Sequence, residues 1–361
     1  MAKKVYKMAE LFCGPGGLGL AAMLASEESN SSIKPIWAND IDRDTCDTYI
    51  QNIHGGSSNN ILCAPVESID FTKIPDFDGL SFGFPCNDFS IVGEQKGIEG
   101  KFGPLYSYGI KAINQKNPDW FVAENVTGLE SSNSGKIFNI ILRELKFAGA
   151  GYNITAHKYK FEEYCVPQKR HRIIVVGIRK DLKKYFLVPK PIISKSSDYL
   201  TVKDALTNPS ISKSTKNNEI TRQSFEVIER LKHIPPGGNA WHDGIPDHLK
   251  LNVKGTKLSN IYRRLKIDEP SYTITGSGGG GTHVYHWDEP RALTNRERAR
   301  IQTFPDTFEF SGNKESVRKQ IGMAVPPEGG KHIFKALLKT LSGEKYDYIY
   351  SDFGEKTDKL L

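Results

Sequence analysis

One cysteine and one glutamate lie at positions where their side chains could take part in catalysis. Cys86 follows an apolar run that predicts a β-strand, in the segment Gly83-Phe84-Pro85-Cys86-Asn87-Asp88-Phe89-Ser90. Because Pro85 stiffens this loop, the thiolate of Cys86 could be presented to a substrate as a nucleophile. Glu124 ends the apolar run 120–123 and should emerge at the same edge of the sheet. Partial burial there would raise the pKa of its carboxyl group and let it act as an acid near neutral pH.

A row of fixed donors is the third chemical feature. The segment Gln168-Lys169-Arg170-His171-Arg172 precedes another apolar, strand-like run. If the segment is extended, Gln168, Arg170 and Arg172 point to one side, and Lys169 and His171 point to the other. The two guanidinium forks would then face anions or carbonyl oxygens together. By the same alternation, His171 should be a packing or surface histidine.

A glycine-rich turn predicts a bound nucleotide-like ligand. The turn Phe12-Cys13-Gly14-Pro15-Gly16-Gly17-Leu18-Gly19 follows a strand-like run and opens a helix-like one. Its glycines allow a sharp turn and let a ligand touch the backbone. Asp40 ends the next apolar run, where a carboxylate could accept hydrogen bonds from ribose hydroxyls. The turn lacks the Gly-Lys-Ser/Thr ending that cradles phosphates.

Each feature taken alone also fits an ordinary structural role. A glycine turn with a surface aspartate is common, and most cysteines are small core residues. A glutamate at a strand end can cap a helix or form a surface ion pair, and a basic strand end can simply be solvated. The core interpretation is kept for Cys13, Cys46, Cys63 and Cys165.

The elements around these residues predict an α/β fold. The first 180 residues alternate short strand-like runs with helix-like ones, which is typical of a parallel sheet covered by helices. Strands are expected to end at Leu11, Asn39, Gly83 and Ala123.

Later segments add strands, helices and a boundary. Strands are expected at 152–160 and 173–178, paired with each other, and helices at 137–145, 293–302 and 328–341. From about Leu187 the chain becomes rich in Ser, Lys, Asn and Pro, and glycine and proline clusters punctuate it up to residue 281. We expect a second, loop-rich part there.

Composition excludes several classes of protein. The 361 residues are enough for two domains, and no apolar run approaches the roughly 20 residues of a membrane span. The N-terminus lacks the apolar middle of a secretory signal, so a cytoplasmic protein is expected. The five cysteines form no Cys-x-x-Cys pair, which predicts neither a metal site nor disulfides. A net charge of +7 is compatible with a polyanionic partner.

Together the motifs resemble those of the DNA (cytosine-5)-methyltransferases of bacterial restriction-modification systems. The ordered blocks are Phe12-x-Gly14-x-Gly16-Gly17, Pro85-Cys86, Glu124-Asn125-Val126, Gln168-x-Arg170-x-Arg172, 291–306 and 320–327. The resemblance spans nearly the whole chain. It implies a Rossmann-like, S-adenosylmethionine-dependent methyltransferase sheet, formed by residues 1–184 and 316–361. A smaller, loop-rich DNA target-recognition domain would occupy residues 185–315.

The resemblance also implies a covalent mechanism on a flipped-out cytosine. Carbon 5 of cytosine is a poor nucleophile, so the Cys86 thiolate would first add to carbon 6. Glu124 would supply a proton at ring nitrogen 3 and prevent negative charge from accumulating. Arg170 and Arg172 would hold the cytosine oxygen and a nearby phosphate, and would help to keep Cys86 ionised. Carbon 5 would then take the methyl group of S-adenosylmethionine, and loss of its proton would expel the cysteine.

The resemblance further assigns binding residues and partners. Residues 322–325 would return to close the cofactor pocket. Expected cofactor contacts are Phe12, Gly14, Gly16, Gly17, Leu18, Asp40, Ile41, Gly83, Pro85, Met323 and Ala324. Expected DNA contacts are Ser90, Gln168, Lys254, Lys257, Arg263 and Arg264. The partners would be double-stranded DNA and a restriction endonuclease acting on the same site, and the protein would be a monomer.

Some positions depart from the family pattern, and other functions compete. Asn87 replaces the usual glutamine, Met323 replaces the usual asparagine, and Pro65 lies where an acid for the adenine amino group is expected, with Glu67 nearby. A tRNA cytosine-5 methyltransferase would share the chemistry, but the Cys-Phe-Thr segment of that branch is missing. A catalytically silent DNA-binding relative is a further alternative. A nicotinamide-dependent oxidoreductase would rest on the glycines alone.

Overall fold

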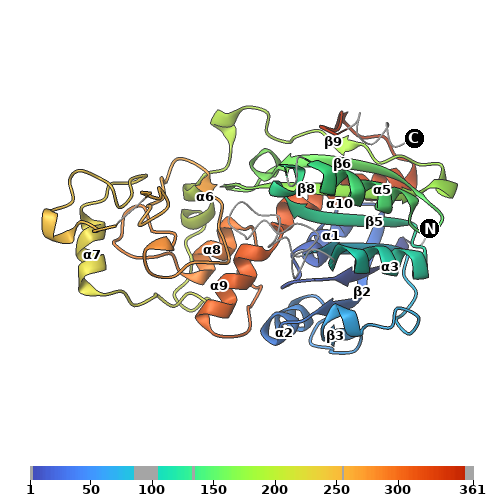
Figure 1. Cartoon of the computed structure of the whole chain (residues 1–361), viewed down its shortest axis with the longest axis horizontal. Helices are drawn as coiled ribbons and strands as arrows, with labels where there is room; N and C mark the ends of the chain where they lie inside the picture. Colours follow the sequence, from blue (N-terminus) through green and yellow to red (C-terminus); the bar gives the residue numbers. More distant parts are fainter. Residues whose placement is uncertain (1–2, 85–104, 132–134, 254–255, 354–361) are drawn as a thin grey trace.

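A seven-stranded sheet forms the larger part of the molecule, in the order β3-β2-β1-β4-β5-β8-β6 (Figure 1). The computed structural model describes residues 3–84, 105–131, 135–253 and 256–353. The strands of this sheet are β1 (Lys4–Leu11), β2 (Ser31–Asp40), β3 (Ile61–Cys63), β4 (Gly79–Gly83), β5 (Trp120–Val126), β6 (Tyr152–Lys160) and β8 (His171–Arg179). Strands β1 to β5 are parallel, whereas β8 is antiparallel to both β5 and β6. The expected fold class and the pairing of the two late strands are confirmed.

Helices cover both faces of this sheet. The helices are α1 (Gly17–Glu27), α2 (Arg43–Asn52), α3 (Tyr106–Lys116), α4 (Gly128–Ser131), α5 (Lys136–Phe147), α6 (Val202–Thr207), α7 (Phe225–Lys232), α8 (Asn295–Ile301), α9 (Lys314–Met323) and α10 (Pro327–Ser342). Helices α3 and α5 contribute to one hydrophobic cluster with the sheet, and α1 and α10 contribute to another. Strands buried on both faces need continuous apolar runs, which is why β4 and β5 are recognisable in the sequence.

The helix boundaries follow local signals in the sequence. The expected helix at 328–341 is α10, which begins with Pro327 in its first turn and ends before Gly343, a residue with φ 77°. The helix expected from residue 293 begins two residues later, because Thr294 is its N-cap and forms a capping box with Glu297.

The candidate site lies at the carboxyl ends of the parallel strands. Strands β1 and β4 end as expected at Leu11 and Gly83, whereas β2 continues to Asp40 and β5 continues to Val126. Asp40 and Glu124 are therefore strand residues, with positions fixed by the sheet. The carboxyl ends of neighbouring parallel strands lie at one edge, which is where ligands bind in open α/β sheets.

A second part of the molecule extends away from the sheet. Helix α7 lies far from the strands, and α8 and α9 lie between them (Figure 1). Around α7, residues such as Leu231, Ile245 and Tyr285 form a separate small hydrophobic cluster. Two further two-stranded pairings join β7 (Gln168–Lys169) to β10 (Ser271–Tyr272), and β9 (Val188–Pro189) to β11 (Tyr348–Ile349). Within the described ranges, no helix is both long enough and apolar enough to cross a bilayer.

Candidate functional site

The glycine turn after β1 is tied to the end of β2. The carboxylate of Asp40 accepts hydrogen bonds from the backbone N–H groups of Gly14 and Asp42, each at 3.0 Å. The N–H of Cys13 donates to the carbonyl of Asn39 at 3.0 Å. Burial raises the pKa of Asp40, although the two backbone donors oppose that shift. Each carboxylate oxygen keeps a further lone pair, so Asp40 can still accept a hydrogen bond from a ligand.

Two glycines of the turn differ in the space that surrounds their backbone. Gly14 has φ 55°, and a Cβ built on it would meet nothing within 4 Å, so its backbone faces open space. A Cβ on Gly17 would lie 2.4 Å from the carbonyl oxygen of Val325, so only glycine allows this close approach. The structure therefore brings the turn together with the segment after α9, as the resemblance implied.

Apolar side chains near the turn differ in their exposure. Ile41 is 69% exposed and Met323 is 61% exposed, which leaves both free to contact a ligand. Phe12 is half-buried and has φ 53°. Leu18, by contrast, is buried in the hydrophobic cluster shared with α10, so its expected cofactor contact is confined to the main chain. Ala324 is buried as well.

Glu124 and Arg172 form a largely buried ion pair near the end of β5. The Nε of Arg172 lies 3.0 Å from Oε1 of Glu124, and the two side chains are 13% and 12% exposed. Burial raises the pKa of Glu124, while the charges of Arg172 and then Arg170 lower it in part. Oε2 of Glu124 would lie 3.1 Å from a Cβ on Gly83, the last residue of β4. Oε2 thus faces the end of β4, the strand that leads toward Cys86.

Several predicted site residues lie outside the described residues. They are Pro85, Cys86, Ser90 and Lys254, and Asn87, which departs from the family pattern, lies outside the described residues too. The last described residue before Cys86 is Phe84, whose carbonyl accepts a hydrogen bond from Asn125 at 3.3 Å. Asn125 follows Glu124 directly, so this bond holds the chain beside Glu124 two residues before Cys86.

Arg170 and Gln168 face the interior of the protein. The Nη1 of Arg170 donates to the carbonyl of Ile274, and Nη2 donates to those of Gly322 and Ala324, all at 2.9 Å. Gln168 is fully buried, accepts a hydrogen bond from the N–H of Ile274 at 2.7 Å and donates to Gln302 at 2.9 Å. These bonds engage both terminal nitrogens of Arg170 and the amide of Gln168, whereas the buried Nε of Arg170 has no hydrogen-bond partner among the described residues. We therefore assign positioning roles to Arg170 and Gln168 in place of the predicted contacts with cytosine and DNA.

The predicted alternation of this segment is nevertheless visible. Lys169 is exposed between the buried Gln168 and Arg170. His171 points away from the row and lies 2.8 Å from the carboxylate of Glu162. Arg172 is thus the member of the row that reaches the candidate acid.

Arg264 also has a structural task in place of the predicted DNA contact. It is buried, and its guanidinium donates to the carbonyls of Leu231, Ile234, His286 and Glu289 at 2.8 to 3.2 Å. These bonds hold the small cluster around α7 together. Of the other predicted DNA contacts, Lys257 lies 5.4 Å from the ring centre of Trp241, and Arg263 lies 4.5 Å from that of Tyr272. Their contact with DNA stays a prediction.

Glu10 is a buried acid that the motif analysis missed. It is 1% exposed and accepts hydrogen bonds from the hydroxyls of Tyr49 and Ser81. Its carboxylate packs against Gly19. Burial raises the pKa of Glu10 to about 7, against the effect of its hydrogen bonds. An acid inside the otherwise apolar run 8–11 was the signal available in the sequence.

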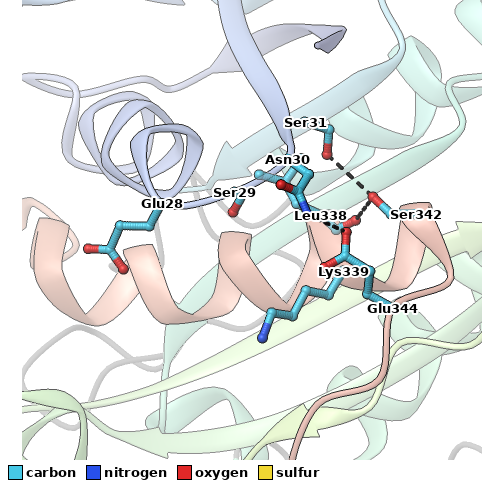
Figure 2. Close-up of a pocket in the computed structure, with 8 residues that line it drawn as sticks. All are labelled: Glu28, Ser29, Asn30, Ser31, Leu338, Lys339, Ser342 and Glu344. Carbon is cyan, nitrogen blue, oxygen red and sulfur yellow. Dashed lines mark hydrogen bonds between the residues drawn. The ribbon is translucent and has the colours of Figure 1, made fainter. Parts of the chain in front are cut away.

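A polar pocket lies between the start of β2 and the last turns of α10 (Figure 2). Its lining includes Glu28, Ser31 and Ser342, and the hydroxyls of the two serines are 3.5 Å apart. Ser31 is the first residue of β2, whereas Asp40 is the last. The pocket therefore lies at the opposite end of the strands from Asp40 and Glu124. We do not assign it to the candidate site.

Comparisons with known proteins give relatives that match nearly the whole chain. The family profile described as C-5 cytosine-specific DNA methylase matches residues 6–339. The type II methyltransferase M.BbvI of Brevibacillus brevis is 54% identical over 96% of this chain and 94% of its own length. M.NgoFVII of Neisseria gonorrhoeae is 40% identical over 98% of this chain and 89% of its own length. A solved Escherichia coli prophage protein described as a DNA modification methyltransferase shares the fold, with a TM-score of 0.66, 24% identity and coverage of 93% and 99% of the two chains.

Proposed function

The chain belongs to the family of C-5 cytosine-specific DNA methylases, and from that premise we propose that Cys86, Glu124 and Arg172 carry out its reaction. The protein transfers a methyl group from S-adenosylmethionine to carbon 5 of cytosine in DNA. The observation that supports the assignment is the buried Glu124–Arg172 pair beside the end of β4, the strand after which Cys86 follows in the sequence.

The residues around the glycine turn fit the cofactor. The open backbone at Gly14 suits the methionine part, which carries no phosphate, and the exposed Ile41 suits the adenine ring. The remaining lone pairs of the Asp40 carboxylate suit the ribose hydroxyls. S-adenosylmethionine supplies a methyl group made electrophilic by the adjacent sulfonium centre. We propose that these residues hold it, with Met323 at the rim.

The proposed chemistry assigns one task to each side chain. Glu124, whose pKa is raised by burial, supplies a proton to nitrogen 3 of the flipped-out cytosine. Arg172 binds Oε1 of Glu124 and so orients the carboxyl group. The Cys86 thiolate forms a bond to carbon 6, which makes carbon 5 nucleophilic. Once carbon 5 is methylated, loss of its proton and breakage of the carbon–sulfur bond restore the aromatic ring.

Substitution of Cys86 tests this assignment. We expect Cys86→Ser to abolish methyl transfer to duplex DNA while cofactor binding, measured by calorimetry, stays close to that of the wild type. DNA with 5-fluorocytosine, which cannot lose a proton from carbon 5, should trap the wild-type protein covalently but not the variant. Cys165→Ser, which changes a cysteine outside the site, is the matched control. Trapping of Cys86→Ser, or loss of its cofactor binding, would contradict the site assignment.

We also propose the biological setting. The type II relatives support a role beside a restriction endonuclease that acts on the same site. We propose a monomer that works in the cytoplasm, with residues 185–315 providing target recognition. The predicted boundary at residue 315 falls within α9, and Phe304 and Ile321 share one hydrophobic cluster with Leu20 and Tyr49. A domain boundary at residue 315 therefore crosses a continuous core.

A further inference from the structure

A buried tyrosine of α2 packs against the glycine turn. Tyr49 is 0% exposed. A Cβ on Gly16 would lie 3.1 Å from Cδ2 of Tyr49, and a Cβ on Gly19 would lie 3.2 Å from its hydroxyl oxygen. Ile53, at the C-cap of α2, would lie 2.7 Å from the first Cβ and 3.4 Å from the second. Since these two positions leave no room for a larger residue, α2 touches the backbone of the turn and of α1 directly.

The same packing connects two sides of the proposed cofactor region. At Gly14 the turn is open, because a Cβ there would meet nothing within 4 Å. Helix α2 therefore supports the turn at Gly16 and leaves Gly14 free for a ligand. The helix begins just after Asp40 and Ile41, with Asp42 as its N-cap. The contacts of α2 thus fix the turn relative to the end of β2.

Glu10 fixes the hydroxyl of this tyrosine. The hydroxyl of Tyr49 donates to Oε1 of Glu10, and the hydroxyl of Ser81 donates to Oε2 at 3.1 Å. A Cβ on Gly19 would lie 2.5 Å from the same Oε1, so the carboxyl group also lies against the first turn of α1. One buried side chain therefore joins β1, β4, α1 and α2.

The bond between Tyr49 and Glu10 is costly to break. Burial raises the pKa of Tyr49, so its hydroxyl keeps the proton that it donates. A buried polar group that loses its partner is left desolvated without compensation. Without the bond, the tyrosine ring would no longer be fixed against the glycines that it touches.

We propose that Tyr49 and Glu10 are positioning residues for the cofactor, a role that rests on the proposed function. In this assignment neither side chain touches the cofactor. Together they hold the turn in the conformation that leaves Gly14 open, at a fixed distance from Asp40. Because the turn is already ordered, binding loses less conformational entropy and the affinity is higher.

The test is calorimetric binding of S-adenosylhomocysteine, the product form of the cofactor, to the full chain. Tyr49→Phe keeps the ring and removes the hydroxyl, and we expect it to raise the Kd roughly tenfold. Its kcat at saturating cofactor and DNA should stay within about twofold of the wild type. Tyr152→Phe is the matched control. Tyr152 is also 0% exposed, its hydroxyl donates to the carbonyl of Pro118 at 2.6 Å before the start of β5, and its loss should leave the Kd unchanged.

Two substitutions of Glu10 test its part in the pair. Glu10→Gln keeps an oxygen that accepts from Tyr49 and an amide that can donate to Ser81, so its Kd should stay close to that of the wild type. Glu10→Ala removes both partners and should weaken binding at least as much as Tyr49→Phe does. The double variant of Glu10→Ala and Tyr49→Phe should bind no more weakly than Glu10→Ala alone, because both changes remove the same contact.

Two results would overturn the proposal. The first is an equal Kd for Tyr49→Phe and Tyr152→Phe with the melting temperature lowered in both, which would make the hydroxyl purely structural. The second is additive losses of affinity in the double variant. If Glu10→Ala fails to fold, the milder Tyr49→Phe decides.

The same measurement separates this inference from the catalytic assignment. Because binding needs no turnover, a Cys86→Ser background should give the same ratios of Kd, even if Cys86 proves not to be the nucleophile. A wild-type protein that binds no S-adenosylhomocysteine would overturn both the positioning role and the proposed function.

Discussion

At the scale of single residues, two opposing effects set the protonation of Glu124. Burial favours the neutral carboxyl group, and the nearby guanidinium of Arg172 favours the carboxylate. The net effect raises the pKa above the usual value of a glutamate. An acid with a raised pKa that is held by a fixed donor can act near neutral pH.

Replacement of Glu124 should therefore affect turnover far more than binding. We expect Glu124→Gln to lower kcat by a factor on the order of 10²–10⁴, because the amide cannot transfer a proton to the ring. Single-turnover methylation of duplex DNA, together with cofactor and DNA affinities, would measure the split. Glu130→Gln, which changes a partly exposed glutamate on α4, serves as the control. An unchanged rate would remove Glu124 from the mechanism.

The pH dependence of stability should report on Glu10. Its pKa is raised from 4.5 to about 7 on folding, so the unfolded chain releases this proton at a lower pH than the folded protein does. Stability is therefore lost as pH rises from about 4.5 to about 7, by about 3 kcal/mol from this group. Glu10→Gln should lack that loss. Urea unfolding at both ends of the window would show it, and parallel pH profiles for the two proteins would contradict it.

At the scale of elements, Arg170 joins three segments that are distant in sequence. It connects the chain after β7 to Ile274, two residues beyond β10, and to Gly322 and Ala324 at the end of α9. Three buried carbonyl oxygens depend on its donors, so their loss has a high cost in free energy.

Arg170→Met should accordingly destabilise the fold. Because the carbonyls would lose their partners while the apolar volume is roughly kept, we expect a loss of about 2–4 kcal/mol, measured by urea denaturation. Lys169→Ala, at the exposed neighbouring position, should change stability by no more than about 0.5 kcal/mol. Equal effects of the two substitutions would show that Arg170 does not link these elements.

Some of this arrangement could be predicted from the sequence. Apolar runs and glycine turns located β1, β4 and β5, and residue alternation placed Gln168 and Arg170 on one side. Alternation cannot show what packs against that side, and the partners Ile274 and Gly322 lie more than 100 positions away. The predicted DNA contact of Arg264 was wrong for the same reason. In a sequence, an arginine that donates hydrogen bonds to buried carbonyls cannot be distinguished from an arginine on the surface.

At the scale of the whole molecule, the region between residues 208 and 294 was the least predictable. Its small cluster gathers Leu231, Ile245 and Tyr285 from loops as well as from α7, so no helix or strand period marks them. Helices and strands can be recognised in a sequence from their repeating apolar positions. Loops such as these are held by hydrogen bonds to backbone carbonyls and by long-range packing, which leave no such repeat.

The whole protein should modify cytosine in one short sequence context. We expect bisulfite sequencing of DNA from cells that express it to show protected cytosines with a shared flanking sequence, because similar chains are type II methyltransferases. Cells that express Cys86→Ser should show none. Protection spread over unrelated contexts would argue against specific target recognition.

The contact between Gly17 and Val325 has a consequence for protein synthesis. One wall of the proposed cofactor region contains Gly17, and the facing wall contains Val325, more than 300 residues later in the sequence. A ribosome-bound chain can therefore build most of the sheet early, yet it completes the cofactor region only after the segment following α9 has left the exit tunnel. Methylation competence would then be acquired in one late step of translation.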